Sequence, residues 1–352
     1  MKHIKFKTCI IGLATAVLSV LGLLAYEKPE NVQAAARTYT ISSYSDYAGL
    51  LNGNMLQTGD TVKLGANINL STGQAFVISQ NITFDGNGKT IKYTGTKYSK
   101  GNGKQLFVIA NKTVTIKNLI IDANGGVDIC LSNNGSSKLT LSGTCKFYNA
   151  LATEIIFNST SNQGNTITIP EGSTVNISGL NNTNTSNGIG TGYDGGSQNQ
   201  RKYGTINVNG TLTIYNKALA GICGASDTTI NFGTNSFAKI STCMAGGIRT
   251  FGGTVNLRNA EIYNGNTGVD IDSSYIRSTN TYYYGKLNMY AGTKIYNNKT
   301  YGLYVSSKCT AAIGGAVITG SSTYINSEKV TSYGIYISSG ATVTNNGGTI
   351  KH

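Results

Sequence analysis

A repeated tripeptide constrains the fold of this chain more than any other feature. It reads apolar, Asn, apolar, and its copies start 24, 25 and 32 residues apart, at Ile206-Asn207-Val208, Ile230-Asn231-Phe232, Val255-Asn256-Leu257 and Leu287-Asn288-Met289. Successive side chains of a strand point to opposite faces, so each copy places two apolar side chains inside and the Asn outside. One such turn of chain buries too little apolar surface to be stable alone, so the turns must stack. The repeat predicts a parallel β-helix.

The remaining sequence supports the same coil. Gly-aliphatic steps recur with the tripeptide, at Gly221-Ile222, Gly247-Ile248, Gly268-Val269, Gly302-Leu303 and Gly334-Ile335. Corners between short strands need left-handed backbone, which fits the 45 Gly and Asn-rich turns such as Tyr215-Asn216, Tyr263-Asn264 and Tyr296-Asn297. We predict an all-β, single-stranded parallel β-helix over residues 76–352, with about ten coils of three short strands each. Residues 181–202 and 273–284 exceed the period and are expected to be loops.

The N-terminus has the pattern of a secretory signal peptide. Lys2, Lys5 and Lys7 precede an uncharged run over residues 8–25, and small residues follow at 34–36. We predict a signal peptide over the first 36 residues and a secreted, extracellular protein, with cell-surface association as an extension of that location. The alternative is an uncleaved membrane anchor, although the apolar run is short for a bilayer. No later apolar stretch has spanning length, so we expect no membrane span after cleavage.

Residues 37–75 differ from the repeat and are predicted to form an N-terminal cap. The pattern indicates a strand at 39–42, a helix at 45–51 that starts at Ser43 or Ser45, and strands at 62–64 and 68–70. A stack of coils leaves its first coil open, and a small helix with a strand covers such an edge.

The segments "GDTVKLGANINL" at 59–70 and "ITFDGNGKTIKYTG" at 82–95 carry a family resemblance. Together with the opening strand and short helix, they resemble the pectate-lyase-like adhesive domains found in surface proteins of Gram-positive bacteria. The resemblance covers residues 38–125, and the rest matches as a generic parallel β-helix. It implies a right-handed parallel β-helix and an adhesive function. Asp85-Gly86-Asn87-Gly88 is expected to be a tight corner.

The enzymes that share this fold have signatures that are missing here. Pectate lyases carry a Trp-Ile-Asp-His segment and an Arg-x-Pro-x-x-Arg segment, and polygalacturonases carry paired Asp and a Gly-His-Gly. This chain has no Trp, and its His and Pro residues are limited to His3, His352, Pro29 and Pro170. Neither enzyme signature is therefore present, and a hydrolase triad built on His is excluded. Fold alone does not establish an enzyme.

One outward column of residues remains as a candidate site. Asp270 and Asp272 alternate with apolar residues, so both are expected on the same outer face. Arg249 follows its Gly-aliphatic step at the register of Asp270, and Tyr304 and Tyr336 occupy the same position in later coils. An aligned strip of charged and aromatic side chains would form a platform for sugars, because Tyr offers a flat apolar ring and a hydroxyl. Arg249, Asp270, Tyr304 and Tyr336 are the candidate ligand-binding residues.

The charged part of this column has three interpretations. Arg249, Asp270 and Asp272 would bind calcium and a uronate with Arg as the base, or the carboxylates would act as a glycosidase pair. They are equally accounted for by an ion pair between stacked strands. Asp128 is expected at the same register in an earlier coil. We expect no cofactor and no metal for a binding protein, and calcium for a lyase.

Five cysteines follow the first 36 residues: Cys130, Cys145, Cys223, Cys243 and Cys309. Their odd number and the absence of C-x-x-C spacing argue against a disulfide framework and against zinc. We predict buried free thiols, with Cys130–Cys145 or Cys223–Cys243 as the alternatives for a bridge.

The net charge of the chain indicates the class of its binding partner. The whole chain has a net charge of +13, and removal of the first 36 residues leaves 24 basic and 13 acidic side chains, a net charge of +11. Such a surplus favours anionic polymers or simply keeps the protein soluble. No dense basic run and no nucleic-acid module occurs, so we expect a polysaccharide or an anionic wall or host glycan and no nucleic acid. The leading hypothesis is a non-catalytic adhesin or surface protein; the alternatives are a polysaccharide lyase or hydrolase and a structural spacer.

Overall fold

The computed structural model describes residues 35–158, 164–179, 187–191, 197–198, 202–320, 322–325, 328–331 and 333–351. Nearly all of the predicted signal peptide therefore lies outside the described residues. Residues 37–352 form one compact unit. None of the helices in the described part of the chain has the length and hydropathy of a membrane span.

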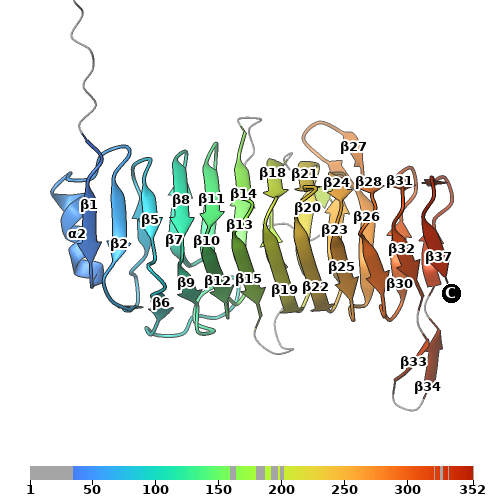
Figure 1. Ribbon diagram of the computed structural model, residues 1–352, viewed down its shortest axis with the longest axis horizontal. Helices are drawn as coiled ribbons and strands as arrows, with labels where there is room; N and C mark the ends of the chain where they lie inside the picture. Colours follow the sequence, from blue (N-terminus) through green and yellow to red (C-terminus); the bar gives the residue numbers. More distant parts are fainter. Residues whose placement is uncertain are drawn as a thin grey trace, which may run out of the picture. The chain divides into compact units, whose positions relative to one another are not determined.

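Three parallel sheets, here called A, B and C, run along this unit (Figure 1). Sheet A consists of β1 (Thr38–Ile41), β2 (Thr61–Leu64), β5 (Thr83–Asp85), β8 (Thr113–Lys117), β11 (Lys138–Ser142), β14 (Thr166–Ile169), β18 (Tyr203–Val208), β21 (Asp227–Phe232), β24 (Thr254–Leu257), β28 (Lys286–Met289), β31 (Thr310–Ile313) and β36 (Thr342–Asn345).

Sheet B consists of β3 (Ile68–Leu70), β6 (Thr90–Tyr93), β9 (Ile120–Asp122), β12 (Thr144–Tyr148), β15 (Thr174–Ser178), β19 (Thr211–Lys217), β22 (Phe237–Cys243), β25 (Ala260–Tyr263), β29 (Lys294–Tyr296), β32 (Val317–Thr319) and β37 (Thr349–Lys351). The main path of sheet C consists of β4 (Phe76–Ile78), β7 (Gln105–Ala110), β10 (Ile129–Asn134), β13 (Thr153–Asn158), β16 (Asn187–Gly190), β20 (Ala220–Ala225), β23 (Gly246–Phe251), β26 (Thr267–Ile276), β30 (Tyr301–Val305) and β35 (Tyr333–Ile337). β17 (Ser197–Gln198) and β27 (Thr281–Tyr284) pair with β26, and β33 (Ser322–Ile325) pairs with β34 (Glu328–Thr331).

Neighbours within each main sheet are strands of successive coils, so the fold is the predicted parallel β-helix. Sheet B contains 11 strands, which corresponds to about 11 coils in the described residues, close to the number expected from the repeat. The four tripeptides align in sheet A, with their Asn residues paired in register. Their apolar side chains are buried and belong to one hydrophobic core cluster that continues from coil to coil.

The outward Asn residues of the tripeptides form an amide ladder on sheet A. Asn231 Nδ2 donates to Asn207 Oδ1 at 3.0 Å, and Asn256 Nδ2 donates to Asn231 Oδ1 at 2.8 Å. Asn288 Nδ2 continues the chain to Asn256 Oδ1 at 2.8 Å. The recurring Asn thus links consecutive coils through side chains as well as through the backbone.

The Gly-aliphatic steps mark the corner where sheet B turns into sheet C. A Cβ atom at Gly247 would lie 2.3 Å from Ile262 Cγ2 and 2.8 Å from the carbonyl oxygen of Gly268. At Gly268 it would lie 2.4 Å from Ile295 Cγ2. Only hydrogen fits between the backbone at this corner and the Ile side chain of the next coil in sheet B, so Gly recurs for lack of space. The Asn-rich turns behave as predicted, because Asn216, Asn264 and Asn297 have φ values of 56°, 56° and 52°.

The first coil is covered by α2 (Tyr44–Asn52). Ser43 is its N-cap and forms a capping box with Asp46, which fixes the start of the helix. Tyr47 is buried, donates to the Val77 carbonyl oxygen at 2.7 Å and packs on the ring of Phe76. The predicted helix is confirmed, and of the two predicted starts, Ser43 and Ser45, Ser43 is the N-cap.

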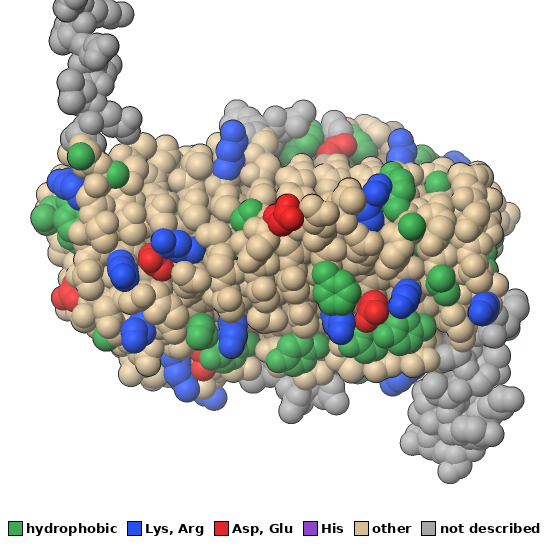
Figure 2. All heavy atoms as spheres, in the orientation of Figure 1, with side chains coloured by type: hydrophobic (Ala, Val, Ile, Leu, Met, Phe, Trp, Pro, Cys, Tyr) green, Lys and Arg blue, Asp and Glu red, His purple; other side chains and the backbone are tan. Residues whose placement is uncertain are grey.

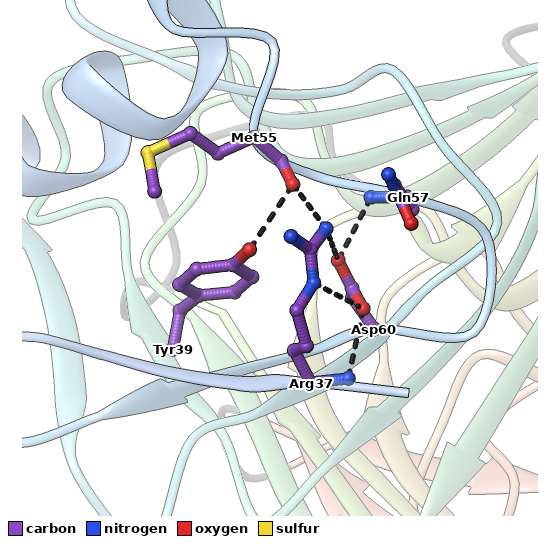
Figure 3. A network of polar contacts seen from close by, with 5 residues as sticks. All are labelled: Arg37, Tyr39, Met55, Gln57 and Asp60. Carbon is purple, nitrogen blue, oxygen red and sulfur yellow. Dashed lines mark hydrogen bonds and ion pairs between the residues drawn. The ribbon is translucent and has the colours of Figure 1, made fainter. Parts of the chain in front are cut away.

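A polar network joins the start of β1 to the loop after α2 (Figure 3). Arg37 forms an ion pair with Asp60 at 2.9 Å, and the Gln57 backbone amide donates to the same carboxylate at 2.8 Å. Tyr39 and Arg37 both donate to the Met55 carbonyl oxygen. Because Asp60 is buried, these donors satisfy a carboxylate that would otherwise destabilise the cap.

Two expectations about the loops need correction. Residues 181–202 were expected to be loop throughout, but they include β16, a strand of sheet C, whose Asn-Gly-Ile-Gly sequence lacks apolar alternation. Residues 273–284 form the end of β26 and the antiparallel strand β27, so this loop is a hairpin. All five described cysteines are buried thiols, as predicted, and neither alternative bridge forms.

Candidate functional site

The outer face of sheet C carries the column of side chains that the sequence indicated. Arg249 pairs in register with Asp270, and Asp270 pairs with Tyr304 of the next coil. Tyr336 follows Tyr304 in the same register. The structure therefore brings the four candidate ligand-binding residues into one line. They lie on consecutive strands, which are spaced about 4.8 Å apart along the stack.

Alternation with the core fixes the outward direction of this column. Ile248, Val269 and Leu303 each precede a member of the column and are fully buried. Because successive side chains of a strand point to opposite faces, the following residues must face outward. Asp128, in contrast, does not share this register: it precedes β10, is buried and accepts the backbone amides of Gly101 and Gly103.

Arg249 and Asp270 form an ion pair that is sheltered from solvent. Arg249 Nε donates to Asp270 Oδ2 at 2.9 Å, and the side chains are 21% and 15% exposed. The guanidinium carbon lies 4.8 Å from the ring centroid of Phe251. Burial raises the pKa of Asp270 above its usual value, the Arg249 charge opposes this rise, and the charge of Asp272 adds to it. The ion pair between stacked strands is therefore present.

Asp272 lies two residues further along β26 and also projects outward. Its Oδ1 accepts the backbone amide of Ser273 at 2.7 Å, which orients the carboxylate. Among the residues that the structure describes, no three His, Cys, Asp or Glu side chains are grouped so that they would hold a metal ion. Calcium at Asp270 and Asp272 would therefore need most of its oxygen ligands from water or from a bound sugar.

Four tyrosines form an aromatic surface at the C-terminal end of this column, here called the tyrosine platform: Tyr301, Tyr304, Tyr333 and Tyr336. The Tyr304 and Tyr336 rings stack with centroids 5.4 Å apart and an interplanar angle of 3°. Tyr301 lies 5.0 Å from Tyr336 and 6.3 Å from Tyr333. Tyr333 and Tyr336 are 56% and 43% exposed, so the platform presents ring surface to solvent.

Sequence reasoning missed two members of the platform. Tyr301 and Tyr333 begin β30 and β35, in the repeated Tyr-Gly-aliphatic-Tyr segments that end at Tyr304 and Tyr336. The matching spacing in two coils was a signal that both rings stack, because Tyr301 and Tyr333 are register partners.

A second aromatic pair lies on the outer face of sheet B. The rings of Tyr263 and Tyr296 stack with centroids 5.1 Å apart and an interplanar angle of 1°. Beside them, the Glu261 carboxylate lies 4.0 Å from both Lys239 and Lys294. Because the Glu261 carboxylate offsets part of the charge of the two lysines, this face presents aromatic surface more than net charge.

On one face of the molecule, basic side chains are dispersed rather than concentrated (Figure 2). On the face shown in Figure 2, Lys and Arg lie singly among uncharged polar groups, and acidic side chains lie between them. This distribution differs from the continuous basic stripe typical of proteins that follow a nucleic-acid backbone.

Fold and surface together define a parallel β-helix that displays charged and aromatic side chains on the flat outer faces of its sheets. The backbone is similar to that of a solved chain titled "L. reuters 100-23 SRRP", with a TM-score of 0.47 and 18% sequence identity over 92% of this chain and 96% of that chain. No family profile and no curated protein matches the sequence.

Proposed function

We propose that this chain is a non-catalytic β-helix that binds carbohydrate, acting outside the bacterial cell as an adhesin or surface protein. The observation that carries the proposal is the straight column Arg249, Asp270, Tyr304 and Tyr336, which continues into the tyrosine platform. A polysaccharide lying along the stack would meet one such side chain per coil.

The chemistry of the column suits sugars. Tyr rings pack against the apolar face of a pyranose while their hydroxyls form hydrogen bonds. Ring stacking within the platform holds Tyr304 and Tyr336 nearly parallel, so little side-chain entropy is lost on binding. Weak contacts repeated along a rigid face add up for a polymer that engages several at once.

The proposal is tested by measuring how residues 37–352 of the protein bind polygalacturonate, alginate and host-type glycans. We expect Tyr336→Ala to weaken binding of at least one of these polymers about tenfold, a loss of about 1.4 kcal/mol. Tyr290→Ala is the matched control, because Tyr290 is also exposed but follows β28 in sheet A. Equal affinities for the wild type and Tyr336→Ala across all polymers would contradict the proposal.

The second candidate function is cleavage of an acidic polysaccharide by Asp270, Asp272 and Arg249. The raised pKa of Asp270 favours it, since a general acid must keep its proton near the working pH. Incubation with the same polymers and calcium would then release unsaturated or reducing ends. Products that disappear in Asp270→Ala would support catalysis, and the absence of products from the wild type would exclude it for these substrates.

A further inference from the structure

The hairpin of β26 and β27 shapes a cavity that lies apart from the column on sheet C. The first part of β26 pairs with β23 and β30, whereas its last four residues pair with β27. The hairpin leaves the stack after Asp272 and returns at Gly285, where β28 enters sheet A. Figure 1 shows β27 beside the ends of the sheet A strands.

The cavity has a volume of about 340 Å³ and lies between this hairpin and the corner that leads into sheet A. Its lining includes Ser226, Asp227 and Thr229 from the stack, Tyr282 and Tyr284 from the hairpin, and Lys286 from β28. The volume is at the small end of the range of about 300–1,000 Å³ for ligand pockets, which suits one sugar ring rather than a large cofactor.

Two serine hydroxyls are buried near this cavity without a hydrogen-bond partner among the described residues. Ser226 lines the cavity, is 1% exposed, and its Oγ forms no hydrogen bond within the described residues. Ser274 Oγ is likewise buried without a partner, and it lies 3.0 Å from where a Cβ atom of Gly252, another lining residue, would be. Both oxygens lie beneath the accessible surface of the cavity, so contacts with a ligand would come from the Tyr rings, Asp227 and Lys286.

The hairpin wall is aromatic and internally braced. Tyr282 and Tyr284 stack with centroids 6.2 Å apart and an interplanar angle of 9°, and Tyr275 lies 4.9 Å from Tyr282. The Tyr275 hydroxyl donates to Asn280 at 2.6 Å across the turn of the hairpin. Tyr282 is 57% exposed, so its ring is available to pack on a ligand.

We infer that this cavity binds a single pyranose unit of an oligosaccharide. The Tyr rings would pack on the apolar face of the sugar, Asp227 would accept hydrogen bonds from ring hydroxyls, and Lys286 would donate to ring oxygens. The lining carries one carboxylate, Asp227, and one ammonium, Lys286, so it suits a ligand rich in hydroxyls better than phosphate or sulfate. This inference adds a discrete sugar site to the extended face of the proposed function.

Short saccharides test the cavity separately from the polymer face. Lactose, cellobiose and digalacturonate would be titrated into residues 37–352 of the protein. Calorimetry measures the affinity, and ligand-observed NMR detects weak binding. We expect at least one of them to bind, and Tyr282→Ala and Thr229→Val each to weaken its binding at least tenfold. Tyr282 is largely exposed and Thr229 faces outward between register partners, so neither change threatens folding.

Tyr336→Ala is the matched control, since it removes an exposed Tyr from the tyrosine platform but leaves the cavity intact. Disaccharide affinity should be unchanged in this variant even where polymer binding falls. Failure of the wild type to bind any of the three saccharides would overturn the inference without touching the polymer proposal. So would disaccharide binding that persists in both cavity variants or that is lost in Tyr336→Ala.

Discussion

A lysine and a glutamate from different coils are buried together in the stack. Lys217 Nζ donates to Glu154 Oε2, and neither side chain is exposed. The second carboxylate oxygen, Glu154 Oε1, has no hydrogen-bond partner within the described residues. Burial raises the pKa of Glu154 to about 7, although the Lys217 charge opposes the rise. The pair therefore holds two desolvated groups whose stability depends on each other.

Separate and joint replacement of this pair should give opposite results. We expect Glu154→Leu or Lys217→Met alone to lower the free energy of unfolding by about 3–5 kcal/mol, because the remaining group is buried without a partner. The double variant should match or exceed the wild type, since an apolar pair needs no desolvation. Urea unfolding of the four proteins measures this cycle. Additive losses in the double variant would show that the two side chains do not act as a pair.

The same pair predicts a pH dependence of known sign. Glu154 releases its proton near its ordinary pKa of 4.5 when unfolded and near 7 when folded. Between these values the folded state binds more protons, so the free energy of unfolding falls as pH rises through this window. The double variant should lack this component. A difference between wild type and double variant that is constant from about pH 4 to about pH 8 would contradict the prediction.

At the scale of strands and corners, packing between sheets B and C determines whether a coil tolerates a side chain in place of Gly. Gly247→Ala should lower the free energy of unfolding by about 1–3 kcal/mol, because the new methyl group overlaps Ile262 and the backbone of Gly268. Gly49→Ala is the matched control: no atom lies within 4 Å of the new Cβ in α2, and the change should stabilise the protein by about 0.5–1 kcal/mol. Thermal unfolding of both variants measures the contrast. Equal midpoints would mean that the corner has room for a side chain.

The strands were predictable wherever apolar alternation identified the inward residues. Such residues align from coil to coil, so the register of Asn207 with Asn231, and of Arg249 with Asp270, followed from the repeat. β16 was missed because its Gly residues hide the alternation. The contact of Glu154 with Lys217 joins strands of different sheets and separate coils, which a single repeat period does not reveal.

Part of the candidate site could also be predicted from the register of the strands. Register placed its column on one face, but ring stacking depends on side-chain direction at neighbouring positions, so Tyr301 and Tyr333 were missed. The cavity beneath the β26–β27 hairpin depends on where an insertion folds back, and no periodic signal specifies that position. The Tyr-rich sequence of the hairpin was visible, whereas its position across the cavity from Ser226 was not.

At the scale of the whole stack, the predicted N-terminal cap is expected to protect the open end of the first coil. α2 covers the first coil through Tyr47, which packs against Phe76 and Phe84 of the core. Deleting residues 37–60 should expose these rings and the edge of β2, which is otherwise paired with β1. We expect oligomers or aggregates in size-exclusion chromatography with light scattering. A monomeric, soluble truncated protein would show that the cap is dispensable for closing the stack.

Charge and aromatic surface predict different responses of polymer binding to salt. Raising the salt concentration from about 0.1 M to about 1 M shortens the screening length from about 10 Å to about 3 Å, so attraction between the basic protein and an anionic polymer should weaken. Stacking on Tyr304 and Tyr336 involves no net charge and should persist.

Polygalacturonate and its methyl ester form a matched pair of ligands, since esterification removes the charge and retains the sugar rings. We expect salt to lower affinity for the acid but not for the ester, and Tyr336→Ala to lower affinity for both, as measured by calorimetry at the two salt concentrations. If salt had no effect on the acid, the net charge of the protein would contribute only to solubility, and recognition would rest on the tyrosine platform alone.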